Sequence, residues 1–80
     1  MQAWVIQLGT FGHKENALKL RDRLRAGGYA CFIETVEGKR GKLYRVKVGP
    51  ILDREEARAL LTRLEKAFRL KGLVRPYHGG

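Results

Sequence analysis

The chain has 80 residues, enough for a single domain with a modest core, which excludes a large buried catalytic cavity. Seventeen Lys and Arg against eight Asp and Glu give a formal net charge of +9, which predicts attraction to a polyanion or an acidic surface without identifying it. The single cysteine, Cys31, excludes an intramolecular disulfide, and we interpret it as a small apolar strand residue.

The first predicted strand covers residues 3–9 and runs into a tight glycine turn. Trp4, Ile6 and Leu8 alternate along it, so they should face the core while Gln7 points away. A lone polar side chain inside an apolar strand either faces water or binds a ligand. Gln7 is therefore the first candidate binding residue.

A helix is predicted over residues 14–27, because Ala17, Leu20 and Leu24 form one apolar stripe at helical spacing. The basic side chains of this segment lie largely off the stripe, as is typical of a solvated helix face. The glycine pair at positions 27–28 should end the helix, since the residue after a helix commonly takes a left-handed conformation.

Two strands are predicted next, at residues 29–36 and 42–48, with a polar, glycine-flanked turn at 37–41 between them. We expect the two strands to pair as a hairpin. In the second strand one set of alternating residues should face the core and the other should point outward. The core-facing set is Tyr44, Val46 and Val48, and the outward set is Leu43, Arg45 and Lys47.

A second helix should begin after Asp53, whose side chain can cap it, with two acidic residues in the first turn, where the helix dipole favours them. Its apolar stripe consists of Ala57, Leu60, Leu61, Leu64 and Phe68. The last predicted strand covers residues 73–77. Pro76 lacks a backbone donor, so it should either end this strand or place it at a sheet edge.

The predicted order is β-α-β-β-α-β, which indicates an α+β fold of the ferredoxin-like or RNP-like type: a four-stranded antiparallel sheet with two helices on one face. The first and third strands should be adjacent at the centre of the sheet. Gln7 and Arg45 would then be neighbours on the uncovered face. Residues 3–77 form one domain, which we expect to be excised from a longer protein.

Three segments resemble the SPOR (sporulation-related) domain family: Trp-Val-Ile-Gln-Leu-Gly-Thr-Phe at 4–11, Ala-Gly-Gly-Tyr at 26–29 and Leu-Tyr-Arg-Val-Lys-Val-Gly-Pro at 43–50. The resemblance extends over about residues 3–77. It implies non-catalytic binding of bacterial peptidoglycan, with a preference for denuded glycan strands, those stripped of their stem peptides, which occur at the division septum. It also implies a periplasmic or cell-envelope location and recruitment of a parent protein to the septum or cell wall.

The same resemblance implies that the exposed sheet face binds the glycan. By motif position, Gln7 and Arg45 match residues of the family's binding surface. Thr10 stands where the family has Ser, so a hydroxyl is kept. An apolar contact in the last strand matches Val74.

Two further residues are candidates from their positions in the strands. Phe32 shares the parity of Glu34, so it is either an exposed platform for a sugar ring or a core residue displaced by a bulge. Leu43 would be an apolar neighbour of the site. Trp4 could stack on a sugar, but its parity matches that of the apolar set in its strand, and we interpret it as core.

Each polar candidate also has a purely structural interpretation. Gln7 could be a solvated residue of an ordinary sheet. Arg45 could form a surface ion pair with Glu34 across the hairpin. Thr10 could cap the first helix, with or without contacting a ligand.

An RNA-binding module of RNP-like fold is the main alternative, because the fold and the charge both suit it. The matching run at residues 40–47 lacks the expected aromatic residues except Tyr44, which should point to the core, so we expect no nucleic acid partner. An enzyme lacks support, since no nucleophile with a base, no paired carboxylates and no glycine-rich phosphate loop are present. A protein-interaction module is a third alternative.

No cofactor is predicted, and His13 and His78 have no neighbours at metal-ligand spacing, so no metal site is expected. The chain contains neither an apolar stretch long enough to cross a membrane nor a signal-peptide pattern. We expect a monomer that meets a membrane only through a tether outside this chain.

Overall fold

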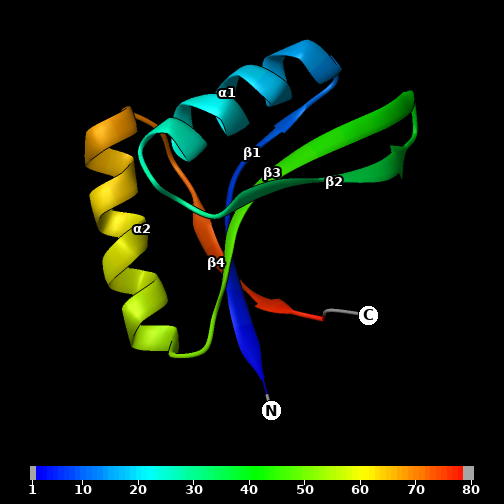
Figure 1. The fold of residues 1–80 in the computed structure, drawn as a ribbon. Coiled ribbons are helices and arrows are strands. Elements are labelled where there is room, and N and C mark those ends of the chain that lie inside the picture. The colour runs from blue at the N-terminus through cyan, green and yellow to red at the C-terminus, as the bar shows by residue number, and fades with distance from the viewer. Residues whose placement is uncertain (1, 79–80) are drawn as a thin grey trace.

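The computed structural model describes residues 2–78 as two helices and four strands in the predicted order (Figure 1). The elements are β1 (Ala3–Phe11), α1 (Lys14–Ala26), β2 (Cys31–Gly38), β3 (Gly41–Ile51), α2 (Arg54–Phe68) and β4 (Leu73–Tyr77). None of these helices is long and apolar enough to span a membrane.

The strands form one antiparallel sheet in the order β2-β3-β1-β4. β1 and β3 are adjacent at the centre, which confirms the predicted topology. β4 pairs only with β1 within the described sheet, so Pro76 lies in an edge strand, where its missing N–H breaks no ladder between two neighbours. Both helices pack on one face of the sheet (Figure 1). We call the other face the open face.

The core lies between the helices and the sheet. Ile6, Val46 and Leu24 are completely buried there, and Leu64 brings α2 into the same cluster. Each such side chain contributes roughly 1.5–3 kcal/mol relative to an exposed position. The predicted core parity of β3 is confirmed, because Val46 and Val48 are buried and Tyr44 packs against the cluster.

The helix ends follow the capping signals in the sequence. Asp53 precedes α2, and its Oδ1 accepts a hydrogen bond of 2.9 Å from the backbone N–H of Glu55. α1 ends at Ala26 with Gly27 as its C-cap, and the following Gly28 has a φ of +91°, in the left-handed region that favours glycine.

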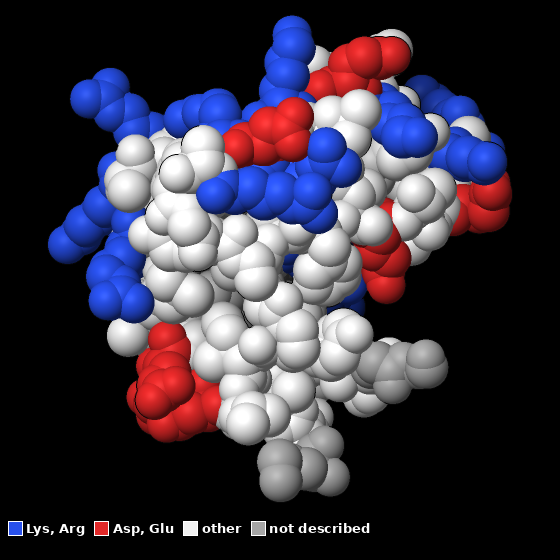
Figure 2. Space-filling model, in the orientation of Figure 1, with Lys and Arg blue, Asp and Glu red and all other residues white. Residues whose placement is uncertain are grey.

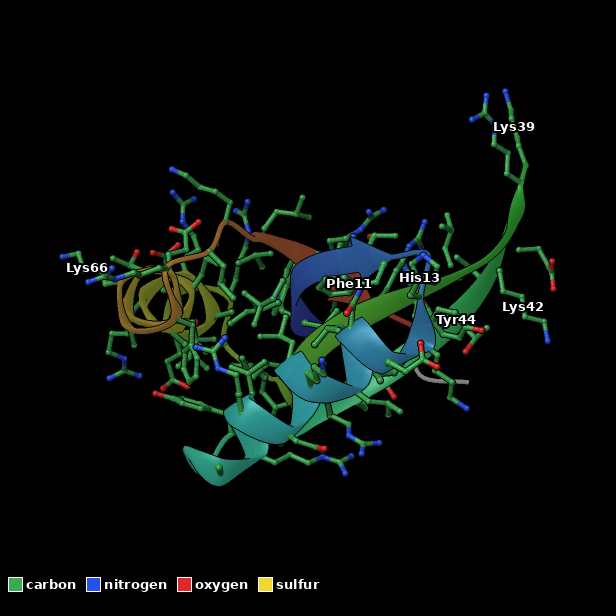
Figure 3. The ribbon with its side chains drawn as sticks, turned by 90° about the horizontal axis from the view of Figure 1, so that it is seen from above. Phe11, His13, Lys39, Lys42, Tyr44 and Lys66 are labelled. Atoms are coloured by element: carbon green, nitrogen blue, oxygen red, sulfur yellow. The ribbon has the colours of Figure 1, made fainter. Side chains whose placement is uncertain are left out.

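The hairpin of β2 and β3 is longer than predicted. Its strands continue to Gly38 and from Gly41, so that only Lys39 and Arg40 remain in the turn. Seen from above, the tip at Lys39 projects well beyond the helices (Figure 3). In this view basic side chains lie over the two helices and the tip of the hairpin, and acidic ones are fewer, with one group beside the start of α2 (Figure 2).

The predicted turn at Gly9 is wrong, because β1 continues to Phe11. The register against β3 shifts between Gln7 and Gly9, so β1 carries one extra residue there. This bulge reverses the alternation, and Leu8 and Phe11 both pack on the core side. Gly9 leaves room for the ring of Phe11, since a Cβ at this position would lie 3.0 Å from that ring.

Candidate functional site

The pairing of the three strands β2, β3 and β1 gathers polar side chains on the open face. Residues directly opposite each other in antiparallel strands share a face. Glu34 pairs with Arg45 and Phe32 with Lys47 in the hairpin, while β1 places Thr10 opposite Arg45 and Gln7 opposite Lys47. The structure therefore brings together four predicted site residues, Gln7, Thr10, Phe32 and Arg45. Leu43 shares their face farther along β3, opposite Val36.

Gln7 and Thr10 lie side by side on the open face, because the bulge in β1 turns both side chains toward it. The Gln7 side-chain amide donates a hydrogen bond of 3.2 Å from Nε2 to Oγ1 of Thr10. Its Oε1 is buried and has no hydrogen-bond partner among the described residues. The alternative role of Thr10 as a helix cap is wrong, since α1 is preceded by His13 at the N-cap position.

Arg45 and Lys47 converge on one carboxylate. Glu34 Oε1 lies 2.9 Å from Nζ of Lys47 and 3.6 Å from Nη1 of Arg45, which confirms the predicted ion pair across the hairpin and adds Lys47 to it. The hydrogen bond from Lys47, with the charge of Arg45, holds the pKa of Glu34 below its ordinary value. Nε of Arg45 is buried without a partner among the described residues.

Two buried polar atoms without partners on one face are unusual, because nearly all such atoms in folded proteins are hydrogen-bonded. Oε1 of Gln7 can accept one hydrogen bond and Nε of Arg45 can donate one. Both atoms have almost no exposed area, so a ligand could pair with them only after the side chains that cover them move.

The open face is curled into a hollow, which we call the aromatic hollow. It has a volume of about 190 Å³. Phe32 of β2 and Tyr77 of β4 meet across it with ring centroids 6.3 Å apart and planes at 73°. In a flat sheet these two strands would be three spacings apart, about 14 Å. The hollow is lined by Phe32, Glu34, Arg45, Lys47, Arg75, Pro76, Tyr77 and His78.

The burial of Val5 is a second sign that the sheet is curled. It has the parity of Gln7 and pairs with Arg75, which lines the aromatic hollow, and it is fully buried although it is outside the core cluster. The alternation that points Gln7 away from the core also points Val5 away from it. It did not predict that this part of the open face is closed over.

The structure corrects the prediction for Val74. This residue pairs with Ile6 and packs against the core cluster, so it faces the helices. Its neighbour Leu73 pairs with Gln7 and is 48% exposed, so by register it is an apolar residue of β4 on the open face, and it also borders a hollow beside α2. Trp4 is half-buried, with the guanidinium of Arg54 5.4 Å from its ring centroid, so it lies beside α2 as a core-side residue.

Sequence reasoning missed Arg75, Tyr77 and Lys47 as site residues. Arg75 and Tyr77 alternate with Val74 in β4, and this alternation was the one signal that could have found them. Lys47 was correctly placed outward but was treated as part of the general positive charge. Its side chain is only 11% exposed, held against Glu34.

Little else in the described residues suggests chemistry. No group of three His, Cys, Asp or Glu side chains within residues 2–78 could hold a metal ion. Burial raises the pKa of the Cys31 thiol to about 11, so it is protonated at neutral pH. Tyr44 packs against the core, so the run that resembles an RNA-binding motif offers no stacking ring to the open face.

The model of the SPOR domain family matches residues 1–76 of the chain. The chain belongs to the SPOR domain family. This confirms the predicted family, and with it the predicted fold.

Known proteins support the assignment. Cell division protein DedD of Escherichia coli is 28% identical over 76 residues, covering 95% of this chain but only 34% of DedD. The chain therefore spans about a third of the length of that curated relative. A solved structure of the SPOR protein DedD has a TM-score of 0.74 at 26% identity, covering 99% of this SPOR domain and 41% of that chain.

Two isolated domains match over nearly their whole length. The crystal structure of the RlpA SPOR domain from Pseudomonas aeruginosa has a TM-score of 0.80 at 23% identity, covering 90% of this chain and 96% of that one. At that identity the likeness concerns the fold alone. The peptidoglycan binding domain of the B. subtilis cell wall lytic enzyme CwlC has a TM-score of 0.75 at 26% identity, with coverage of 98% and 92%.

Proposed function

We propose that the open face of this SPOR domain binds peptidoglycan without catalysis and prefers glycan strands stripped of their stem peptides. The binding would direct a parent protein of the cell envelope to the division septum. Membership of the SPOR family supports this, as do the likeness to a peptidoglycan binding domain and to a cell division protein. The observation that carries the proposal is the strand pairing that gathers Gln7, Thr10, Arg45 and Lys47 on one face, beside the aromatic hollow.

The preference for stripped strands rests on charge. An amidase that removes a stem peptide leaves the lactyl carboxylate of the muramic acid free, so a stripped strand is a polyanion. The side chain of Arg45 is 34% exposed, so its planar guanidinium can donate to a carboxylate, and a charged hydrogen bond of this kind contributes roughly 1.5–3 kcal/mol. Lys47 and Arg75 add positive charge around the aromatic hollow. An intact strand carries an amide at the lactyl position instead and gains less.

The remaining groups suit the uncharged parts of the sugars. Oε1 of Gln7 could accept a hydrogen bond from the N–H of an acetamido group once the side chain moves to expose it, and one of the two hydrogens on its Nε2 is donated to Thr10. The rings of Phe32 and Tyr77 provide apolar surface for a sugar face. Leu43 and Leu73 extend that surface to either side.

The test is co-sedimentation of the purified domain with bacterial sacculi, before and after amidase treatment, at physiological salt. Amidase treatment should raise the bound fraction. Arg45→Ala should abolish the increase. The matched control is Arg63→Ala, which removes the same charge from an exposed position of α2 that does not line the aromatic hollow.

Three results would contradict the proposal. Equal binding before and after treatment would refute the preference for stripped strands. Equal losses in the two variants would show that the +9 charge acts without specificity. Binding that disappears on a modest increase in salt would point the same way, and RNA would then be the next ligand to test.

A further inference from the structure

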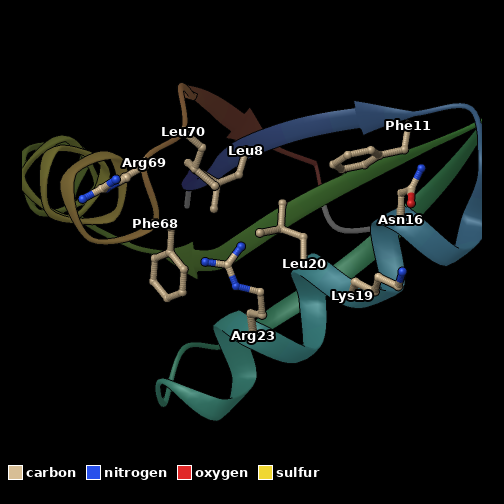
Figure 4. Close-up of a pocket in the computed structure, with 9 residues that line it drawn as sticks. All are labelled: Leu8, Phe11, Asn16, Lys19, Leu20, Arg23, Phe68, Arg69 and Leu70. Carbon is tan, nitrogen blue, oxygen red and sulfur yellow. The ribbon is translucent and has the colours of Figure 1, made fainter.

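The helical side of the domain carries a second depression, which we call the interhelical groove. It lies between α1 and the end of α2 and has a volume of about 500 Å³. The rings of Phe11 and Phe68 stand toward its two ends (Figure 4). Leu8, Leu20 and Leu70 lie between them. The groove therefore has an apolar floor that neither helix covers.

Cationic side chains border this floor. Lys19, Arg23 and Arg69 line the groove, all three are exposed, and no carboxylate lines it within the described part of the chain. The ion pairs described for residues 2–78 involve none of them. Arg23 instead places its guanidinium 5.4 Å from the ring centroid of Phe68, which holds a cation at the edge of the apolar floor.

An apolar floor with a basic border restricts the chemistry of an occupant. A neutral apolar group would cover the floor but leave the border cations without partners. A small inorganic anion would meet the charges but leave the floor exposed to water. A peptide with one or two large apolar side chains flanked by Asp or Glu satisfies both, and the volume lies within the range of about 300–1,000 Å³ common for binding pockets.

We propose that the interhelical groove docks an acidic segment of a partner protein, whose apolar side chains enter between Phe11 and Phe68. The border cations Lys19 and Arg23 would bind its carboxylates. The groove shares no lining residue with the aromatic hollow, so this binding is independent of the proposed glycan binding. One domain could then hold the cell wall and a protein on opposite sides.

The experiment is a selection of random short peptides displayed on phage against the whole 80-residue domain. The expected result is enrichment of sequences in which Leu, Phe or Trp is flanked by acidic residues. In a ¹⁵N-labelled domain, the enriched peptides should shift the amide signals of Phe11, Leu20, Phe68 and Leu70. They should leave those of Gln7 and Arg45 in place.

Charge reversal supplies the matched control. Lys19→Glu combined with Arg23→Glu should weaken peptide binding by roughly tenfold or more, whereas Arg63→Glu with Lys66→Glu should change it little. Both pairs lower the net charge equally, and Arg63 and Lys66 are exposed residues of α2 outside the groove. Thermal melts would establish that both variants fold.

The proposal is overturned if the selection yields no acidic and apolar consensus. It also fails if both charge reversals weaken binding equally, or if the shifted signals lie on the open face. Because sacculi bind elsewhere under the proposed function, saturating sacculi should not displace the peptide. Failure of the groove would leave glycan binding intact, and failure of glycan binding would leave the peptide result intact.

Discussion

Lys47 and Glu34 are joined across the hairpin by an ion pair of 2.9 Å, at the centre of the surface that we propose for an anionic glycan. The carboxylate of Glu34 thereby pairs with Lys47 and Arg45, the cations that a ligand carboxylate would need. Its second contact, 3.6 Å from Arg45, is longer and weaker. Glu34 thus competes with an anionic ligand for Lys47 and Arg45. When a ligand displaces Glu34, Lys47 loses its ion pair, and an anionic group of the ligand can replace it.

Removing this competitor should strengthen glycan binding. Glu34→Gln is expected to raise the affinity for stripped glycan several-fold, measured by titration calorimetry, since Lys47 and Arg45 are then available. Glu37→Gln is the control, because it removes the same charge from an exposed position of the same strand. Equal affinities of the two variants, or a loss in Glu34→Gln, would show that Glu34 does not compete.

The same ion pair should make stability depend on pH in the acid range. The folded-state pKa of Glu34 lies below its ordinary value of 4.5, so the ion pair contributes stability above that pH and loses it as the pH falls through the folded-state value. The contribution should stay under about 1 kcal/mol, since the carboxylate is partly exposed. Urea unfolding of the wild type and Glu34→Gln should differ near neutral pH and converge in acid. If the difference in the free energy of unfolding stays the same at every pH, it does not come from the ionisation of Glu34.

Arg45 should matter more for binding than for folding. Its Nε makes no hydrogen bond in the described structure, so Arg45→Ala should lower the melting temperature by no more than a few degrees. Glycan affinity should fall roughly tenfold to a hundredfold. Arg45→Lys keeps the charge but not the planar fork, and should recover only part of the loss. A large fall in melting temperature with unchanged binding would make Arg45 structural.

Tyr77 should act through its ring. Tyr77→Ala removes one wall of the aromatic hollow and should weaken glycan binding several-fold, whereas Tyr77→Phe should bind like the wild type. Melting curves would separate a local effect from unfolding. If Tyr77→Phe is as weak as Tyr77→Ala, the hydroxyl group and not the ring makes the contact.

Most of the fold could be predicted because its signals are local. The apolar stripes of α1 and α2, the cap at Asp53 and the left-handed Gly28 are each encoded within a few residues. The bulge in β1 could not be predicted, since it is a mismatch against β3 and appears only when the two strands pair.

The aromatic hollow could not be predicted from the sequence for a related reason. The contact of Phe32 with Tyr77 joins the two outer strands of the sheet, and it depends on twist accumulated over all four strands. Residue parity and the predicted topology placed Gln7 beside Arg45, whereas Thr10 was added by the family resemblance. The choice of Val74 came from the family resemblance, which was matched to β4 without knowledge of its register.

The meeting of the outer strands has a mechanical consequence. β4 is short and pairs along one side only, so its amide protons should be among the first to exchange with solvent. A glycan seated between Phe32 and Tyr77 would link β2 to β4 directly, bypassing the two strands between them. Such a ligand would join the two outer strands and reduce the motion of β4. The free energy needed to order β4 would lower the observed binding affinity.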